Sequence, residues 1–166
     1  MRAIGLSLPV FIKWDDAEYG LRAKKAGYPT VSLPGAGGVW HMSWVDKDDL
    51  VGWQAYFHER NRIITALLHS PPYERGGRVV KESQFMDIKH LISMQYYTEA
   101  GRLLAQRDVL DGPDALHPVI GTKLPQIRQM AAEFDDAVAA KDADLYPPVH
   151  VDKPRARDAA SPSPTP

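Results

Sequence analysis

The sequence contains no cysteine and carries no excess of positive charge. Without cysteine the chain can form no disulfide, no thiolate zinc site and no cysteine nucleophile. Its 20 basic and 21 acidic residues leave a formal net charge of −1. Proteins that bind nucleic acid need positive charge to neutralise phosphates, so no nucleic-acid partner is expected.

Long apolar runs are also missing. The apolar start of the chain is too short to cross a bilayer, and no small-residue cleavage site precedes Trp14. We therefore expect a cytoplasmic protein, with peripheral attachment to the inner face of the plasma membrane left open. With 44% hydrophobic and 25% charged residues, the 166-residue chain has an ordinary globular composition.

The amino-terminal part predicts a strand, a helix and a second strand. Residues 4–13 are apolar and partly β-branched, which indicates a short buried strand ending at a pair of carboxylates. Residues 17–26 predict a helix, with Asp16 as its N-cap and Gly27 just after its end. Residues 28–33 predict another strand. Together these elements would form a piece of an α/β layer.

The remainder predicts helices followed by a disordered tail. Helical periodicity indicates a helix of roughly 20 residues from residue 49, a long one over 79–108 and a third over 124–140. The first helix has a stripe formed by Leu50, Trp53, Phe57, Ile64 and Leu67. The buried positions expected on the second are Phe85, Ile88, Leu91, Ile92, Met94, Leu103 and Leu104. The last 20 residues contain six prolines and few large apolar side chains, so we expect them to be disordered.

An acidic cluster stands where the first strand is expected to meet the helix. Asp15, Asp16 and Glu18 repel one another, and such a group is tolerated chiefly beside a cation, a donor-rich ligand or a transferring proton. The simpler interpretation is that Asp16 caps the helix and Asp15 is solvated. Glu18 could also form an ordinary ion pair with Arg22, four residues later.

A second cluster follows a glycine-rich turn. His41 lies between Trp40 and Trp44 and could bind a metal through a neutral ring nitrogen. A single histidine cannot hold a divalent ion, so further carboxylates would be needed. Flat tryptophan faces beside carboxylates are suited to sugar rings. The alternatives are a packed histidine and tryptophans that belong to the core.

A third cluster lies on the first long helix. His58 is next to the apolar stripe, and Arg60 and Arg62 are available to an anionic group such as a diphosphate. The alternative interpretation is a solvated charged face.

In combination these segments resemble a known enzyme family. Residues 15–22, DDAEYGLR, resemble the acidic-pair motif of the large inverting transferases of glycosyltransferase family 2. The string WDDAEYGLRAKKAGYPTVSLPGAGGVWHMSW, followed by DKDDLVGWQAYFHERNR, resembles the polymerising galactofuranosyltransferases of cell-wall galactan synthesis. The resemblance is dense over residues 5–69, continues to about residue 130 and leaves out the proline-rich tail.

The resemblance implies a fold and a domain order. Residues 1–48 would be the carboxyl-terminal part of a GT-A catalytic domain, an α/β fragment with a Rossmann-like sheet. Residues 49–146 would form a mostly α-helical carboxyl-terminal domain, and residues 147–166 the disordered tail. The donor would be UDP-galactofuranose and the acceptor a lipid-linked galactan.

The resemblance also implies roles for particular residues. Asp16 matches the general base that takes the proton of the attacking acceptor hydroxyl, and Asp15 matches its acidic neighbour. His41 matches the histidine of a Mn²⁺ (or Mg²⁺) site.

Other residues are expected to bind substrate. His58 matches a histidine of the active-site region, and Trp40 and Trp44 match its aromatic surroundings. Arg60 completes the expected substrate-binding set through its positive charge.

One part of the family pattern has no equivalent in this sequence. The Asp-x-Asp metal motif lies upstream in the family, and Asp46-Lys47-Asp48 follows the histidine and opens a helix, so it is not that motif. We therefore expect the chain to be inactive alone and to bind metal only when other carboxylates are supplied. Two alternatives are a non-catalytic helical interaction module and one half of a split transferase. Association with a second copy or with an amino-terminal half is also left open.

Overall fold

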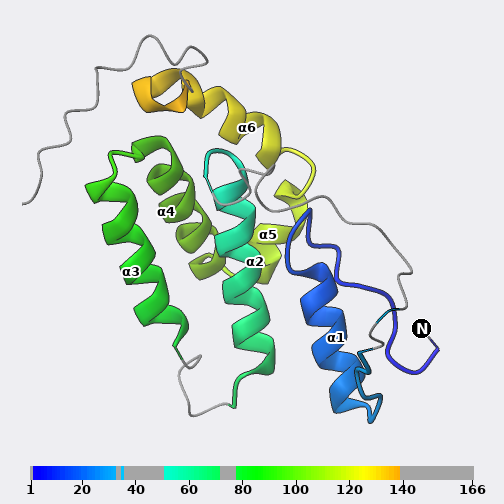
Figure 1. Cartoon of the computed structure of the whole chain (residues 1–166). Helices are drawn as coiled ribbons and strands as arrows, with labels where there is room; N and C mark the ends of the chain where they lie inside the picture. Colours follow the sequence, from blue (N-terminus) through cyan, green and yellow to red (C-terminus); the bar gives the residue numbers. More distant parts are fainter. Residues whose placement is uncertain (1, 33–34, 36–50, 72–77, 139–166) are drawn as a thin grey trace, which may run out of the picture.

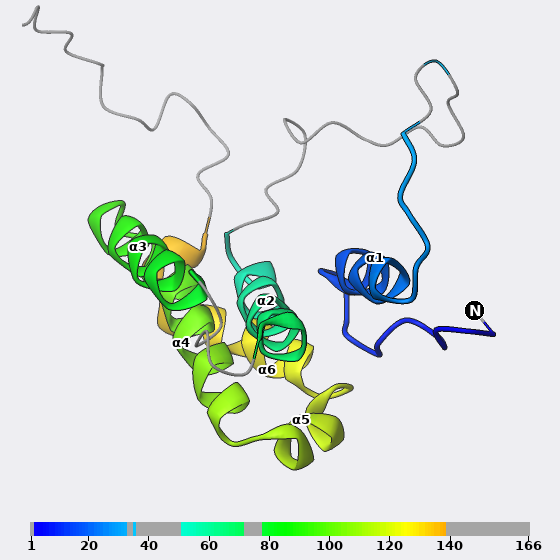
Figure 2. The ribbon, with the colours of Figure 1, turned by 90° about the horizontal axis from the view of Figure 1, so that it is seen from below.

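The computed structural model describes residues 2–32, 35, 51–71 and 78–138, and all regular structure in that part is helical (Figure 1). The α-helices are α1 (Asp15–Lys25), α2 (Gln54–His69), α3 (Val79–Ile92), α4 (Tyr96–Leu110), α5 (Pro113–Val119) and α6 (Lys123–Met130). The short 3-10 turns η2 (Ala131–Glu133) and η3 (Asp135–Ala137) follow α6. Figure 2 shows α1 beside one flank of α2, with α3 and α4 on the other flank.

The predicted α/β fragment of a GT-A domain is wrong for the described residues, because neither expected strand forms there. A strand needs a neighbour to pair its backbone N–H and C=O groups. Here a side chain pairs with some of them: the Arg22 guanidinium donates to the carbonyls of Ile4 and Leu6, both at 2.7 Å. Positive φ angles at Gly5 (76°) and Ile12 (70°) also interrupt the extended run.

Helix α1 forms where a helix was expected but starts earlier. Its first residue is Asp15, and the residue before it is Trp14, with φ of 70°. The prediction that Asp16 caps the helix is therefore wrong. Asp16 lies inside the first turn, where its Oδ1 accepts a hydrogen bond from the Ala17 amide at 2.7 Å. Acidic residues in the first turn and basic residues in the last suit the helix dipole.

The end of α1 confirms the role predicted for Gly27. Its φ is 88°, a conformation that glycine adopts without steric cost. The Gly27 amide donates to the Lys24 carbonyl and the Tyr28 amide to the Ala23 carbonyl, at 3.1 and 3.0 Å. These two hydrogen bonds form a Schellman motif, which stops the helix.

Helix α2 confirms the first long helix, although its buried face differs from the predicted stripe. Phe57 is fully buried as expected, whereas Leu67 is exposed. Leu50 lies outside the described residues. Tyr56 and Glu59, which are not in the stripe, are fully buried because α4 packs along their side of the helix.

The single helix predicted over 79–108 is wrong, because the chain reverses between α3 and α4. Met94 has φ of 55°, its amide donates to the Leu91 carbonyl, and the Gln95 amide donates to the His90 carbonyl. This is a second Schellman motif, with methionine where glycine is usual. The reversal lays α4 antiparallel to α3.

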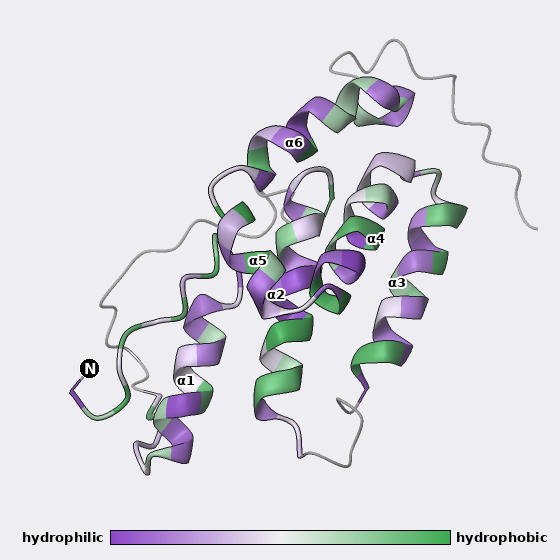
Figure 3. Ribbon diagram, turned by 180° about the vertical axis from the view of Figure 1, so that it is seen from behind, coloured by the Kyte–Doolittle hydropathy of each residue, from purple (hydrophilic) through white to green (hydrophobic). Residues whose placement is uncertain are grey.

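The reversal also changes which residues are buried. Of the expected buried positions only Leu104 packs against the core. Those that are exposed instead are Phe85, Ile88, Leu91, Ile92, Met94 and Leu103. Figure 3 shows hydrophobic residues along α3, and the inward face of that helix is polar, with Ser83 and His90 buried.

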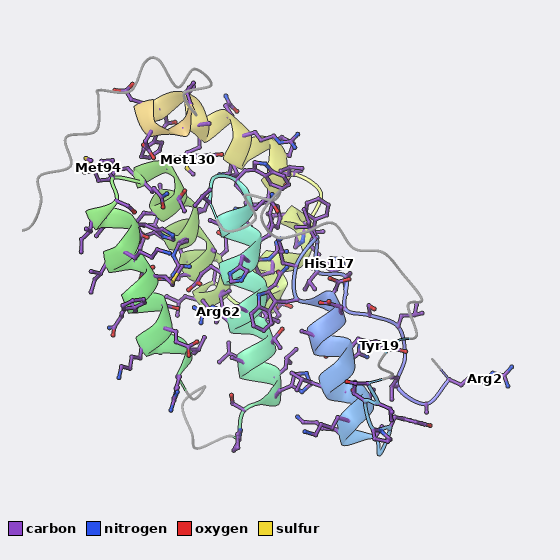
Figure 4. The ribbon with its side chains drawn as sticks, in the orientation of Figure 1. Arg2, Tyr19, Arg62, Met94, His117 and Met130 are labelled. Carbon is purple, nitrogen blue, oxygen red and sulfur yellow. The ribbon has the colours of Figure 1, made fainter. Side chains whose placement is uncertain are left out.

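A buried ionic network explains that polar inward face. The fully buried Glu59 carboxylate pairs with Arg62 and Arg102, each at 2.8 Å, and accepts a hydrogen bond from Ser83 at 2.5 Å. Arg102 also pairs with Asp87 at 2.6 Å. Figure 4 shows Arg62 between α2 and α3. The network links α2, α3 and α4, so these helices depend on one another.

Burial would raise the pKa of Glu59, but the Ser83 hydrogen bond and the charges of Arg102 and Arg62 outweigh it. The pKa is therefore lowered, and Glu59 is ionised in the folded chain.

The apolar core is small and lies between α2, α4 and α6. Its buried members are Tyr56, Phe57, Tyr97, Ala105 and Ile127. The helix predicted over 124–140 is confirmed only in part, since α6 ends at Met130 and gives way to 3-10 turns before the described residues end at 138. No helix in the described ranges is both long and apolar enough to span a membrane. The predicted boundary at residues 48 and 49 and the tail over 147–166 lie outside these ranges.

Candidate active site

The three acids at the start of α1 have different surroundings. Asp16 is exposed, Asp15 is half-buried and Glu18 has only 1% of its surface exposed. Glu18 pairs with Arg22 at 2.8 Å, which confirms the ion pair considered from the sequence, and with His69 of α2 at 3.1 Å. The Glu18 carboxylate is thus bound within the protein, and the exposed Asp16 carboxylate can face a substrate.

The start of α1 contacts the helix that carries His58. The Trp14 and His58 rings meet edge to face, with their centroids 5.8 Å apart. Because Asp15 and Asp16 directly follow Trp14, the structure brings the acidic pair and His58 into one region. The sequence suggested this grouping only through the resemblance.

His58 is neutral near physiological pH in this environment. Burial lowers its pKa to about 4, and the nearby positive charge of Arg62 lowers it further, while Glu59 opposes the shift. A neutral imidazole can donate a hydrogen bond from one nitrogen and accept one at the other. His58 can therefore orient a sugar hydroxyl without adding charge to the site.

Arg60 is placed differently from a freely accessible cation. Only 2% of its surface is exposed, and its guanidinium lies 5.3 and 5.1 Å from the ring centroids of Tyr56 and Phe57. Its Nε donates to the Asn61 Oδ1 at 2.9 Å, while its Nη1 is buried without a hydrogen-bond partner. The role of Arg60 toward a diphosphate stays a prediction, and its observed contacts are with its own helix.

Asn61 was missed by reasoning from the sequence. It is fully buried, and its Nδ2 donates to the carbonyls of Phe11 and Lys13, at 3.0 and 2.8 Å, just before the acidic pair. Its position next to Arg60 in a charged stretch indicated a solvated face. Nothing in the local sequence shows that two carbonyls some fifty residues away need a donor.

The remaining predicted site residues lie outside the described ranges. These are Trp40, His41 and Trp44. Within the described part of the chain no group of three or more His, Asp or Glu side chains could hold a metal ion. The residues described here therefore do not form a complete metal site.

Comparison with known proteins gives consistent matches. A sequence model described as Galactofuranosyltransferase-2, domain 3, matches residues 79–165. This match runs through the tail, which the sequence resemblance had left out.

Two full-length relatives cover most of the chain. Galactofuranosyltransferase GlfT2 of Mycobacterium tuberculosis is 45% identical over 152 residues, which is 90% of this chain and 24% of that protein. Galactofuranosyltransferase GlfT2 of Mycolicibacterium smegmatis is 46% identical over 145 residues, which is 87% of this chain and 22% of that protein. The chain thus spans about a quarter of the length of either relative.

Proposed function

The chain belongs to the galactofuranosyltransferase-2 family, and from that premise we propose that it forms the carboxyl-terminal part of an inverting glycosyltransferase. In this proposal the transferase moves galactofuranose from UDP-galactofuranose to a galactan acceptor. The different surroundings of the three acids support it most directly, because Glu18 is paired and buried while Asp16 is exposed.

The chemistry proposed for Asp16 is general-base catalysis. The acceptor hydroxyl oxygen attacks the anomeric carbon, the bond from that carbon to the UDP oxygen breaks, and the configuration inverts. The hydroxyl proton passes to the Asp16 carboxylate, and UDP leaves with the bonding electrons. A positioned base of this kind contributes on the order of 10²–10⁴-fold to the rate.

The neighbours of Asp16 are proposed to bind the sugars. Trp14 and His58 offer an aromatic face and a neutral imidazole beside the acidic pair. Trp40 and Trp44 retain their proposed aromatic role, and Asp15 its role as acidic neighbour.

We expect the chain to be inactive by itself. It spans about a quarter of its relatives, and its described residues make no metal site. Mn²⁺ or Mg²⁺ is proposed to bind through His41 only when carboxylates from elsewhere complete the ligands, since one histidine does not hold such an ion.

A complementation assay tests the proposal. The chain is mixed with the remaining portion of the M. smegmatis relative, made as a separate polypeptide, together with UDP-galactofuranose and a short galactofuranoside acceptor. Elongated acceptor, resolved by mass spectrometry, should appear only when both polypeptides are present. Asp16→Asn should lower turnover by about 10²-fold or more, since amide nitrogen and oxygen cannot take up the proton.

Two results would count against this. Transfer by the chain alone would show that the inactivity is wrong. Transfer by the mixture at an unchanged rate with Asp16→Asn would show that Asp16 is not the base. Glu133→Gln is the matched control, because Glu133 is an exposed carboxylate on η2.

A further inference from the structure

We infer that Asn61 and His69 of α2 are positioning residues that set the direction of the acidic pair at the start of α1. This inference rests on the proposed function, because it assigns them to the placement of Asp16. Neither residue was singled out from the sequence.

The backbone just before α1 is strained. The Lys13 amide donates to the Phe11 carbonyl at 3.0 Å, so residues 11–13 form a γ-turn with Ile12 at φ of 70°. Such a turn is rare, and positive φ is especially unfavourable for a β-branched residue. Trp14 repeats the strain with φ of 70°. Two such residues in succession persist only when surrounding contacts hold them.

Asn61 supplies those contacts. Its Nδ2 donates to the carbonyls on both sides of Ile12, those of Phe11 at 3.0 Å and Lys13 at 2.8 Å. The orientation of the amide is fixed in turn, because its Oδ1 accepts a hydrogen bond from the Arg60 Nε at 2.9 Å. A buried amide with both ends satisfied holds the turn in one conformation.

His69 fixes α1 at a second point. Its Nε2 lies 3.1 Å from the Glu18 Oε1, and Glu18 is almost completely buried between the two helices. Asn61 and His69 are about two turns apart on α2, roughly 12 Å along its axis. Contacts at two separated points fix both the rotation and the translation of α1.

Asp16 lies between the two anchored points, at Lys13 and Glu18. Its exposed carboxylate is therefore directed by contacts that do not themselves touch a substrate. Loss of an anchor should misplace the carboxylate, and a displacement of about 1 Å can lower turnover by about 10²-fold.

Amide hydrogen exchange of the full chain tests the positioning. Asn61→Asp keeps the size of the side chain but presents oxygens to the two carbonyls. It should speed exchange at residues 14–18 by at least about tenfold and leave α4 unchanged. Gln84→Glu, at an exposed amide on α3, is the matched control. Unchanged exchange at residues 14–18 would overturn the role of Asn61.

A second pair of variants guards against general unfolding. His69→Leu removes the partner of Glu18 and should also speed exchange in α1, whereas His69→Gln restores a donor and should bring the rate most of the way back. His117→Leu, at an exposed histidine of α5, is the control (Figure 4). Equal exchange in the leucine and glutamine variants would overturn the role of His69.

The complementation assay then separates positioning from simple stability. Asn61→Asp and His69→Leu should lower kcat by about 10- to 100-fold and leave the KM for UDP-galactofuranose within about twofold. A rise in KM with unchanged kcat would overturn the inference. If the unsubstituted mixture transfers no sugar, the proposed function fails, while the exchange measurements still decide whether Asn61 and His69 hold α1.

Discussion

At the scale of single residues, the same side-chain type has opposite roles within a few positions. Glu18 and Glu59 are buried and paired with arginines, whereas Asp16 is exposed. A buried carboxylate that lost its partners would be strongly destabilising, so the paired acids belong to the framework. The exposed one is free for chemistry.

The buried environment of His58 makes stability depend on pH. Its pKa of about 4 lies below the ordinary value of 6.5, so between these values the unfolded chain binds a proton that the folded chain does not. The free energy of unfolding should therefore fall as the pH drops from 6.5 to 4. His58 should account for about 1–3 kcal/mol of this fall.

Urea unfolding at pH 7 and pH 4.5 measures this effect. His58→Gln should reduce the pH dependence by that amount. His90, whose pKa is also lowered by burial and by Arg102, contributes equally to both proteins and cancels in the difference. His117→Gln controls for the loss of an exposed imidazole. The same pH dependence in His58→Gln and the unsubstituted chain would refute the prediction.

At the scale of elements, α1 and α3 end in the same motif with different residues. Gly27 occupies the positive-φ position after α1, and Met94 occupies it after α3. For a residue other than glycine this conformation costs roughly 1–2 kcal/mol. Met94 is exposed, so it gains little from packing in return.

Met94→Gly should therefore stabilise the chain. Relief of backbone strain outweighs the greater freedom of glycine in the unfolded chain, for a net gain of about 0.5–1 kcal/mol. Thermal unfolding followed by circular dichroism would show the gain as a higher Tm. Met130→Gly should have the opposite effect, because Met130 is helical and packs against the core (Figure 4). A lower Tm for Met94→Gly would mean that the methionine side chain stabilises the hairpin.

Local signals predicted the helices better than their packing. The end of α1 depends on hydrogen bonds within five residues, so Gly27 was identified from the sequence. The reversal at Met94 has no glycine or proline to mark it, and the apolar residues on both sides suggested one continuous helix. The inward face of α3 is chosen by Glu59 and Arg102, which lie far away in sequence.

At the scale of the whole molecule, the described part of the chain is a helical unit whose candidate site is incomplete. The predicted strands failed because their carbonyls are bound by Arg22 and Asn61 and because no described segment pairs with them. The family membership does not depend on that error, since it rests on identity across most of the chain.

Calorimetry of the whole chain with Mn²⁺ and UDP tests the incompleteness directly. No binding is expected, because His41 alone cannot hold the ion and the described residues add no cluster of ligands. His41→Ala is the control and should behave like the unsubstituted chain. Binding that disappears in His41→Ala would show that the site closes within this chain, contrary to the prediction.

The sequence by itself determined the family, the position of the acidic pair, and the helices whose caps and dipole-matched charges are local. Those features depend on residues a few positions apart, whose interactions the sequence shows directly. Only the tertiary structure decided that Glu18 is buried while Asp16 is exposed, that Asn61 holds the turn before α1, and that α3 turns a polar face inward. Each of these depends on a hydrogen bond or ion pair between segments far apart in the chain, and such a partner exists only once the helices have packed.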